Sequence, residues 1–276
     1  MYLVLLFVAA ALLGDGCNSA NVNKHMRLLS ELDENVASAI RHYGATNARL
    51  FLSLTRRPES SYAHIQGHVI HLVCEATGTP APSIHWFKND APVYELDVES
   101  TELIDGNPSS IARLTSTLIV TRTSARDIYT CVATTGPKTV TATSVVYSLD
   151  GSTEVPERTK LYPLEPQIVV WYRVYVDTIG NNIVLPCRVK GHPRPHVTWL
   201  DNNGEVVGND PRMKVLRSGE LVVSGLRWAD MGGYTCRATN AHGAARVRTF
   251  LYPAAKVSAT STKYSVVNVI QTQWRL

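Results

Sequence analysis

The chain has 276 residues, of which 45% are hydrophobic and 18% charged, and its formal net charge is +4 at pH 7. This composition is typical of a globular protein and excludes a disordered chain. The basic residues form no block of like charge, so the sequence gives no indication of nucleic-acid binding. Beyond the first residues, no apolar run approaches the roughly 18 residues that a membrane-spanning helix needs.

The chain begins with an apolar run, residues 3–13, of the length found in secretory signal peptides. This run is too short to span a bilayer, which favours a cleaved signal peptide over residues 1–19 rather than an uncleaved signal anchor. Cleavage after Ser19 removes Cys17 and leaves an even number of cysteines, as an oxidising compartment favours. Cleavage after Gly16 would instead leave Cys17 as an odd thiol.

Residues 20–50 form an N-terminal segment that precedes any β-pattern. Ser30 and Asp33 resemble a capping box, and Gly44 supplies a C-terminal stop signal. The prediction is a short amphipathic helix, and the alternative is a terminal segment that is helical only part of the time. The apolar residues that recur at spacings of three and four are Leu29, Leu32, Val36, Ile40 and Tyr43.

From about residue 51, short alternating runs separated by turn residues predict β-strands, and they are organised as a two-fold internal repeat. Each copy contains a Cys, a Gly-x-Pro-x-Pro segment, a Trp twelve residues after that Cys, and a Tyr two residues before a second Cys. The first copy has Cys74, Trp86, Tyr129 and Cys131, and the second has Cys187, Trp199, Tyr234 and Cys236.

This framework predicts an all-β protein of two tandem immunoglobulin-like β-sandwiches of the I-set or C2 type. In such a sandwich the two cysteines form a disulfide between the sheets, and the Trp packs in the core against this disulfide. The Tyr hydroxyl donates a hydrogen bond to a backbone carbonyl of the preceding turn. We therefore expect two disulfides, Cys74–Cys131 and Cys187–Cys236. The copies differ before the second Cys: the first has Ala125 and Asp127 where the second has the usual Asp and Gly, which leaves the geometry of that turn open.

The predicted domains are residues 51–150 and 167–253, joined by a linker at 151–166 that is rich in Pro, Gly and charge. A polar tail follows at 254–276. Its one apolar cluster, residues 266–270, is interrupted by an asparagine and is too short for a stop-transfer helix or a lipid-anchor signal. We therefore expect a secreted, extracellular protein without a membrane anchor.

The sequence offers no catalytic, cofactor or metal site. His71 and His85 are predicted to point outward from strands of opposite sheets, so they cannot share an ion. No C-x-x-C, H-E-x-x-H, G-x-S-x-G, phosphate-loop or G-x-G-x-x-G pattern occurs. A proline excludes the sequon at Asn107, so no N-linked sugar is expected. The protein is therefore predicted not to be an enzyme.

Alternation along the last two strands of the second copy places three arginines outward: Arg237, Arg246 and Arg248. Such a basic face could hold an acidic partner or a sulfated glycan. The alternative is a solvated charged face that only discourages aggregation.

The tandem modules, together with the linker at 161–166 and the strand at 167–177, resemble the insect neural/ectodermal development factors. These are secreted immunoglobulin proteins of the imaginal-morphogenesis "late" class, and the resemblance covers roughly residues 50–253. It implies a protein that sequesters insulin-like peptides outside the cell and so antagonises insulin and insulin-like growth factor receptor signalling. The alternative is an adhesion or matrix-associated module that binds a protein or a sulfated glycan.

The segment 168–176 carries apolar residues on both of its faces, unlike a strand that has one face exposed to solvent. One assignment places Ile168, Val170, Tyr172, Val174 and Val176 inward. An exposed aromatic ridge at a sheet edge would then form the partner site, unless another part of the chain covers it as an internal interface. The ridge residues are Trp171, Tyr175, Phe250 and Tyr252.

Overall fold

The computed structural model describes residues 50–65, 68–93, 107–123, 126–149 and 163–255. The predicted signal peptide, the N-terminal helix, the fate of Cys17 and nearly all of the polar tail lie outside these ranges. Within them the chain folds into β-strands and one short 3₁₀ helix, η3 (Trp228–Asp230), which confirms the all-β prediction. No helix in the described part is long and apolar enough to cross a membrane.

The first module packs two sheets around one core. Its disulfide joins Cys74 to Cys131, and Trp86 and Tyr129 are buried beside it. The first sheet begins with β1 (Phe51–Arg56), β3 (Ile70–Thr79) and β6 (Ile111–Val120). The second runs in the order β2 (Ser61–His64), β8 (Lys138–Ser148), β7 (Arg126–Thr135), β4 (Ser83–Lys88) and β5 (Ala91–Pro92).

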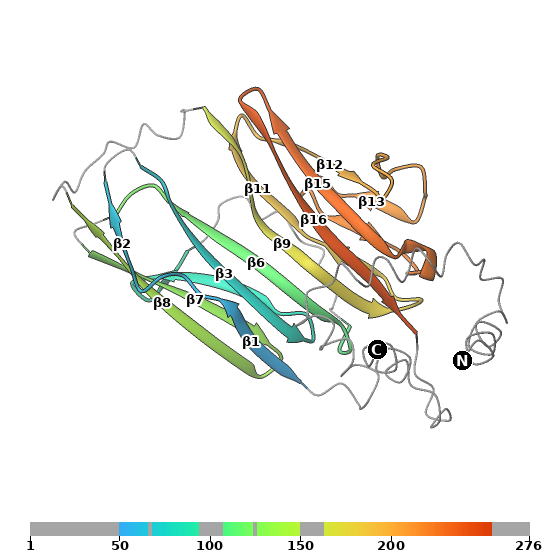
Figure 1. The fold of residues 1–276 in the computed structure, drawn as a ribbon, viewed down its shortest axis with the longest axis horizontal. Helices are drawn as coiled ribbons and strands as arrows, with labels where there is room; N and C mark the ends of the chain where they lie inside the picture. The colour runs from blue at the N-terminus through green and yellow to red at the C-terminus, as the bar shows by residue number, and fades with distance from the viewer. Residues whose placement is uncertain (1–49, 66–67, 94–106, 124–125, 150–162, 256–276) are drawn as a thin grey trace, which may run out of the picture.

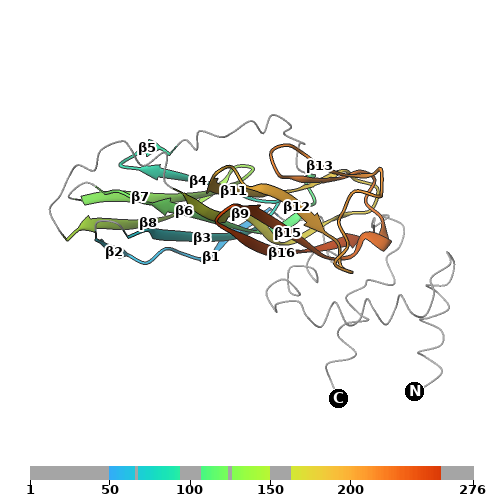
Figure 2. The same cartoon turned by 90° about the horizontal axis from the view of Figure 1, so that it is seen from above.

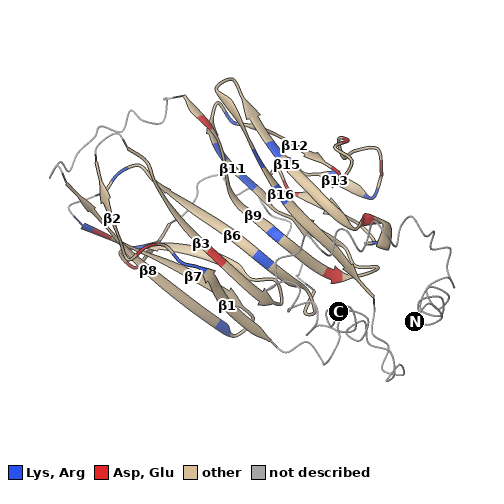
Figure 3. Ribbon diagram, viewed as in Figure 1, with Lys and Arg blue, Asp and Glu red and all other residues tan. Residues whose placement is uncertain are grey.

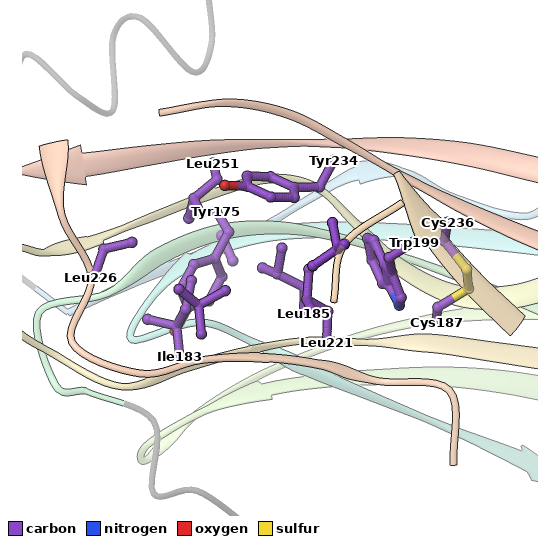
Figure 4. Packing of buried hydrophobic residues seen from close by; sticks show 13 residues of the cluster. Tyr175, Ile183, Leu185, Cys187, Trp199, Leu221, Leu226, Tyr234, Cys236 and Leu251 are labelled. Atoms are coloured by element: carbon purple, nitrogen blue, oxygen red, sulfur yellow. A yellow bond between two sulfur atoms is a disulfide. The ribbon is translucent and has the colours of Figure 1, made fainter. Parts of the chain in front are cut away.

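The second module repeats this plan. Figure 4 shows Trp199 packed beside the Cys187–Cys236 disulfide, with Tyr234 in the same core. One sheet has the order β10 (Ile183–Leu185), β14 (Leu221–Val223) and β13 (Met213–Val215). The other strands are β9 (Leu164–Thr178), β11 (Cys187–His192), β12 (His196–Leu200), β15 (Gly232–Asn240) and β16 (Gly243–Ala254). The first three residues of β9 fall within the stretch expected to be the linker.

The two modules share one eight-stranded sheet. β6 of the first module pairs antiparallel with β9 of the second, from Ile111 opposite Val176 to Ser116 opposite Val170. The sheet therefore runs β1-β3-β6-β9-β16-β15-β12 without interruption, with β11 also beside β9 (Figure 1). The second half of β9 pairs in parallel with β16, as expected for the first and last strands of an immunoglobulin module.

Both cores lie on the same side of this shared sheet. Leu118 of β6 packs in the first core, and Ala112, on the same face of that strand, packs in the second. Figure 2 accordingly shows β4, β5 and β13 on one side of the sheet. We call the opposite side the outer face and define it by Ile111, Arg113 and Thr115, the residues that alternate with the core-facing positions of β6.

A bulge at Arg173 inverts the alternation within β9. The pairing places Arg113 opposite Val174 and Leu114 opposite Tyr172, which leaves Arg173 without a partner in the ladder. An extra residue in one strand changes which side the following side chains face. Residues after Arg173 therefore point opposite to the side that strict alternation assigns them.

This bulge decides which predictions for β9 hold. Ile168 and Tyr172 pack against the second core, in agreement with the predicted inward set. Val174 and Val176 belong to a different cluster on the outer face, so their inward assignment was wrong. Tyr175 was predicted to be exposed, but it is 5% exposed and lies in the second core.

The two modules anchor the turn before their second cysteine with different carboxylates. In the second module Asp230 accepts two hydrogen bonds from Arg212, and its carbonyl oxygen accepts one of 3.0 Å from the Tyr234 hydroxyl. In the first module Asp127 is buried and accepts a hydrogen bond from Asn89. The carboxylate that stands in place of the usual glycine thus supplies an anchor for the first module.

Candidate partner-binding face

The outer face carries an apolar cluster where β6, β9 and β16 lie side by side. Cross-strand pairing brings Ile111 and Tyr252 onto either side of Val176, and Phe250 next to Val174. The Trp228 ring meets the Tyr252 ring edge-on, with centroids 6.3 Å apart. We call this group the outer apolar cluster. Its members are Ile111, Val174, Val176, Met231, Tyr252 and Ala254, with Phe51 and Phe250 packed against them.

The predicted aromatic ridge is only half present. Tyr175 is in the core, where burial raises the pKa of its hydroxyl well above the ordinary value. Tyr252 is on the outer face but is 5% exposed, so its prediction as an exposed residue was also wrong. Trp171 and Phe250 are half-buried. Trp171 lies opposite Thr115 and thus shares the outer face with Phe250.

Next to the outer apolar cluster, a buried carboxylate joins the two modules. Glu75 of β3 is 4% exposed, and its Oε1 accepts a hydrogen bond of 2.6 Å from Arg113 Nε. The same carboxylate accepts hydrogen bonds from the hydroxyls of Thr55 and Thr115. Its Oε2 lies 3.7 Å from the guanidinium of Arg173 in the second module. Glu75 on β3 therefore contacts side chains from three other strands, β1, β6 and β9.

A second buried carboxylate joins the modules at the far end of β9. Asp177 Oδ1 accepts hydrogen bonds from Asn107 of the first module, at 2.6 Å, and from Asn181 of the second. Its Oδ2 accepts the Tyr175 hydroxyl at 3.1 Å. Because Asp177 is 0% exposed, these bonds compensate a charge that has no access to water.

The three arginines of β15 and β16 point away from the core, as the alternation of side chains along these strands predicts. Arg237 lies directly opposite Arg246, and Arg248 follows two residues along β16. All three side chains are exposed. Arg248 Nη2 donates to Asn202 Oδ1 at 3.2 Å, and a Cβ at Gly233 would collide with its guanidinium. The missing side chain at Gly233 thus leaves room for Arg248 to lie across β15.

Histidines do not form a metal site in the part of the chain that is described. His71 Nε2 lies 3.0 Å from Gln167 Oε1, so this histidine contributes to the contact between modules. His85 is exposed on β4. The described ranges contain no group of three or more His, Cys, Asp or Glu side chains that could hold a metal ion.

Comparison with known proteins places the chain in a family. The immunoglobulin I-set domain model matches residues 166–252, and an immunoglobulin domain model matches residues 53–135. The neural/ectodermal development factor IMP-L2 of Drosophila melanogaster is 37% identical over 205 residues, which span 74% of this chain and 77% of the relative. The chain belongs to the IMP-L2 family.

A solved structure and a second relative agree with this assignment. The crystal structure of the neural ectodermal development factor IMP-L2 has a TM-score of 0.66 and 34% sequence identity, and the match covers 75% of this chain and 96% of that one. The zwei Ig domain protein zig-4 of Caenorhabditis elegans is 32% identical over 70% of this chain and 76% of its own length. Membership of the IMP-L2 family confirms the predicted resemblance, the tandem immunoglobulin fold and a binding protein rather than an enzyme.

Proposed function

We propose that the protein is a secreted binding protein that sequesters insulin-like peptides and so antagonises insulin and insulin-like growth factor receptor signalling. The observation that carries the proposal is the match to IMP-L2 along both modules. The resemblance to the neural/ectodermal development factors is what implies insulin-like peptides as the ligand.

The outer face is the proposed docking surface. Aromatic side chains are enriched in the energetic centres of protein interfaces, and an apolar patch on an outer surface commonly marks a partner site. Phe250 on β16 and Trp171 on β9 are half-buried aromatics of this face, on either side of the bulge at Arg173. Tyr175 and Tyr252 are too deeply buried to make large contacts with a partner.

The test is titration of an insulin-like peptide into the secreted protein, followed by calorimetry. Trp171→Ala and Phe250→Ala should each weaken binding by about 2 kcal/mol, or about 30-fold in Kd. Ile128→Ala is the matched control, because Ile128 is an exposed apolar residue of β7 in the five-stranded sheet. The peptide should be recovered intact from the complex by mass spectrometry.

Each variant counts only if its thermal unfolding matches that of the wild type. Unchanged affinity in both well-folded variants would remove the outer face as the docking surface. A wild-type protein with no affinity for any insulin-like peptide, or one that cleaves the peptide, would contradict the proposed function itself.

A further inference from the structure

Four exposed arginines lie on three neighbouring strands of the outer face. Arg237 and Arg246 are directly opposite each other on β15 and β16, and Arg248 lies on the same side two residues later. Arg173 projects from the bulge of β9, with 54% of its side chain exposed. The Thr249 hydroxyl donates to the Tyr172 carbonyl at 2.6 Å, which ties β16 to β9 between Arg248 and Arg173. We call these four residues the arginine stripe.

Two residues of the arginine stripe, Arg237 and Arg246, have no acidic partner within the described part of the chain. Glu75, the carboxylate next to Arg173, is buried and is already held by Arg113. Figure 3 shows basic positions on β6, β9, β16 and β15 of the shared sheet, with the acidic position on β3 beside them.

Fold stability does not account for the placement of these arginines. Like charges directly opposite each other on paired strands are destabilising, and Arg237 and Arg246 have this arrangement. Charges that prevent aggregation belong on edge strands, whereas β15 lies between β12 and β16 in the interior of the sheet. A binding role explains both the choice of arginine and its position.

The surroundings of the stripe favour a hydrophilic ligand. At the end formed by Arg237 and Arg246, the outward neighbours include Thr198 and Thr235, which add hydroxyl groups. The large aromatics of this face, Trp171 and Phe250, adjoin the other two arginines of the stripe. Protein ligands usually need such aromatic anchors at the centre of an interface, and here they lie toward one end of the stripe. Guanidinium groups hold tetrahedral oxyanions with paired, charge-assisted hydrogen bonds, and a row of them suits a linear polyanion. We propose that the arginine stripe binds a sulfated polysaccharide.

The test measures the affinity of the full secreted chain for heparin by surface plasmon resonance, at several NaCl concentrations. The variant Arg237→Gln/Arg246→Gln should bind at least about tenfold more weakly near physiological salt, and the salt dependence of its affinity should be reduced. The control, Arg126→Gln/Arg217→Gln, removes the same charge from exposed positions outside the shared sheet and should bind like the wild type. All variants should unfold at a temperature close to that of the wild type.

Two further probes separate sulfate recognition from general attraction to acidic polymers. Desulfated heparin and poly-L-glutamate should both bind at least about tenfold more weakly than heparin. An equal loss of affinity in the control variant would show that only net charge matters, and would overturn the proposal. Equal binding of poly-L-glutamate, or heparin binding that is unchanged in Arg237→Gln/Arg246→Gln, would overturn it as well.

Discussion

Glu75 and Asp177 are buried carboxylates whose partners come from both modules. A buried charge is tolerated only while its partners remain, because removing one leaves an uncompensated charge away from water. Arg113 makes the two shortest contacts to Glu75, both at 2.6 Å. We expect this ion pair to contribute mainly by fixing the register of the strands that carry it, since a buried ion pair adds little net stability over apolar side chains.

The change Arg113→Met tests this argument. It should lower the free energy of unfolding by about 3–5 kcal/mol, since Glu75 then keeps only hydroxyl partners and the distant Arg173. In the double variant Glu75→Leu/Arg113→Met, much of this loss should be recovered because no unpaired charge is left buried at this site. Urea denaturation of the three proteins measures both effects. A double variant as unstable as the single one would show that lost packing, and not the orphaned charge, dominates.

At the residue scale, the framework of cysteines, tryptophans and tyrosines was predictable because its spacing follows from the immunoglobulin sandwich itself. The carboxylate networks were not predictable. Arg113 and Glu75 are 38 residues apart, as are Asn89 and Asp127, and no local pattern connects either pair. In the sequence, the turn before the second cysteine of the first module lacks the usual aspartate, which is replaced by Ala125, and only the fold brings Asn89 and Thr123 next to Asp127.

Among the elements, β9 departs most from the expected pattern. Its two-sided apolar character was visible in the sequence, and the structure explains it: one side of the strand faces the second core and the other faces the outer apolar cluster. The bulge at Arg173 was not visible, because alternation assigns sides correctly only in an uninterrupted strand. The partner strand β6 was also unforeseen, since nothing in the spacing of one module specifies a pairing with the other.

A substitution on the outer side of β9 tests whether this side is part of a dry cluster. Val176 is 0% exposed, so Val176→Thr would bury a hydroxyl and should destabilise the protein by about 1–3 kcal/mol. Arg246→Thr, on the same face at an exposed position of β16, is the control and should change stability by no more than about 0.5 kcal/mol. Thermal or urea unfolding gives the comparison. Equal stability of the two variants would mean that water reaches Val176.

For the whole molecule, the shared sheet links two modules that would otherwise unfold as independent domains. The link consists of the β6–β9 ladder, the Glu75 and Asp177 networks and the contact between His71 and Gln167. Separating the modules would expose both buried carboxylates and the backbone of the ladder. We therefore expect partial unfolding of one module to be unfavourable while the other remains folded.

Differential scanning calorimetry should show one cooperative transition, with equal calorimetric and van't Hoff enthalpies. The variant Cys187→Ala/Cys236→Ala opens a loop with a sequence separation of 49 and should lose about 2–5 kcal/mol of stability. Because the modules are coupled, its single transition should move to lower temperature without splitting. Two separate transitions in the wild type would contradict the coupling.

The β6–β9 ladder also changes what a partner encounters. In a flexible pair of domains, a ligand that touches both must stop their relative motion, and the lost freedom subtracts from its affinity. Here that ordering has already occurred during folding, because β9 is hydrogen-bonded to a strand of each module. A ligand that spans both modules therefore meets a preorganised platform, and association should resemble the docking of two rigid bodies rather than closure around a hinge.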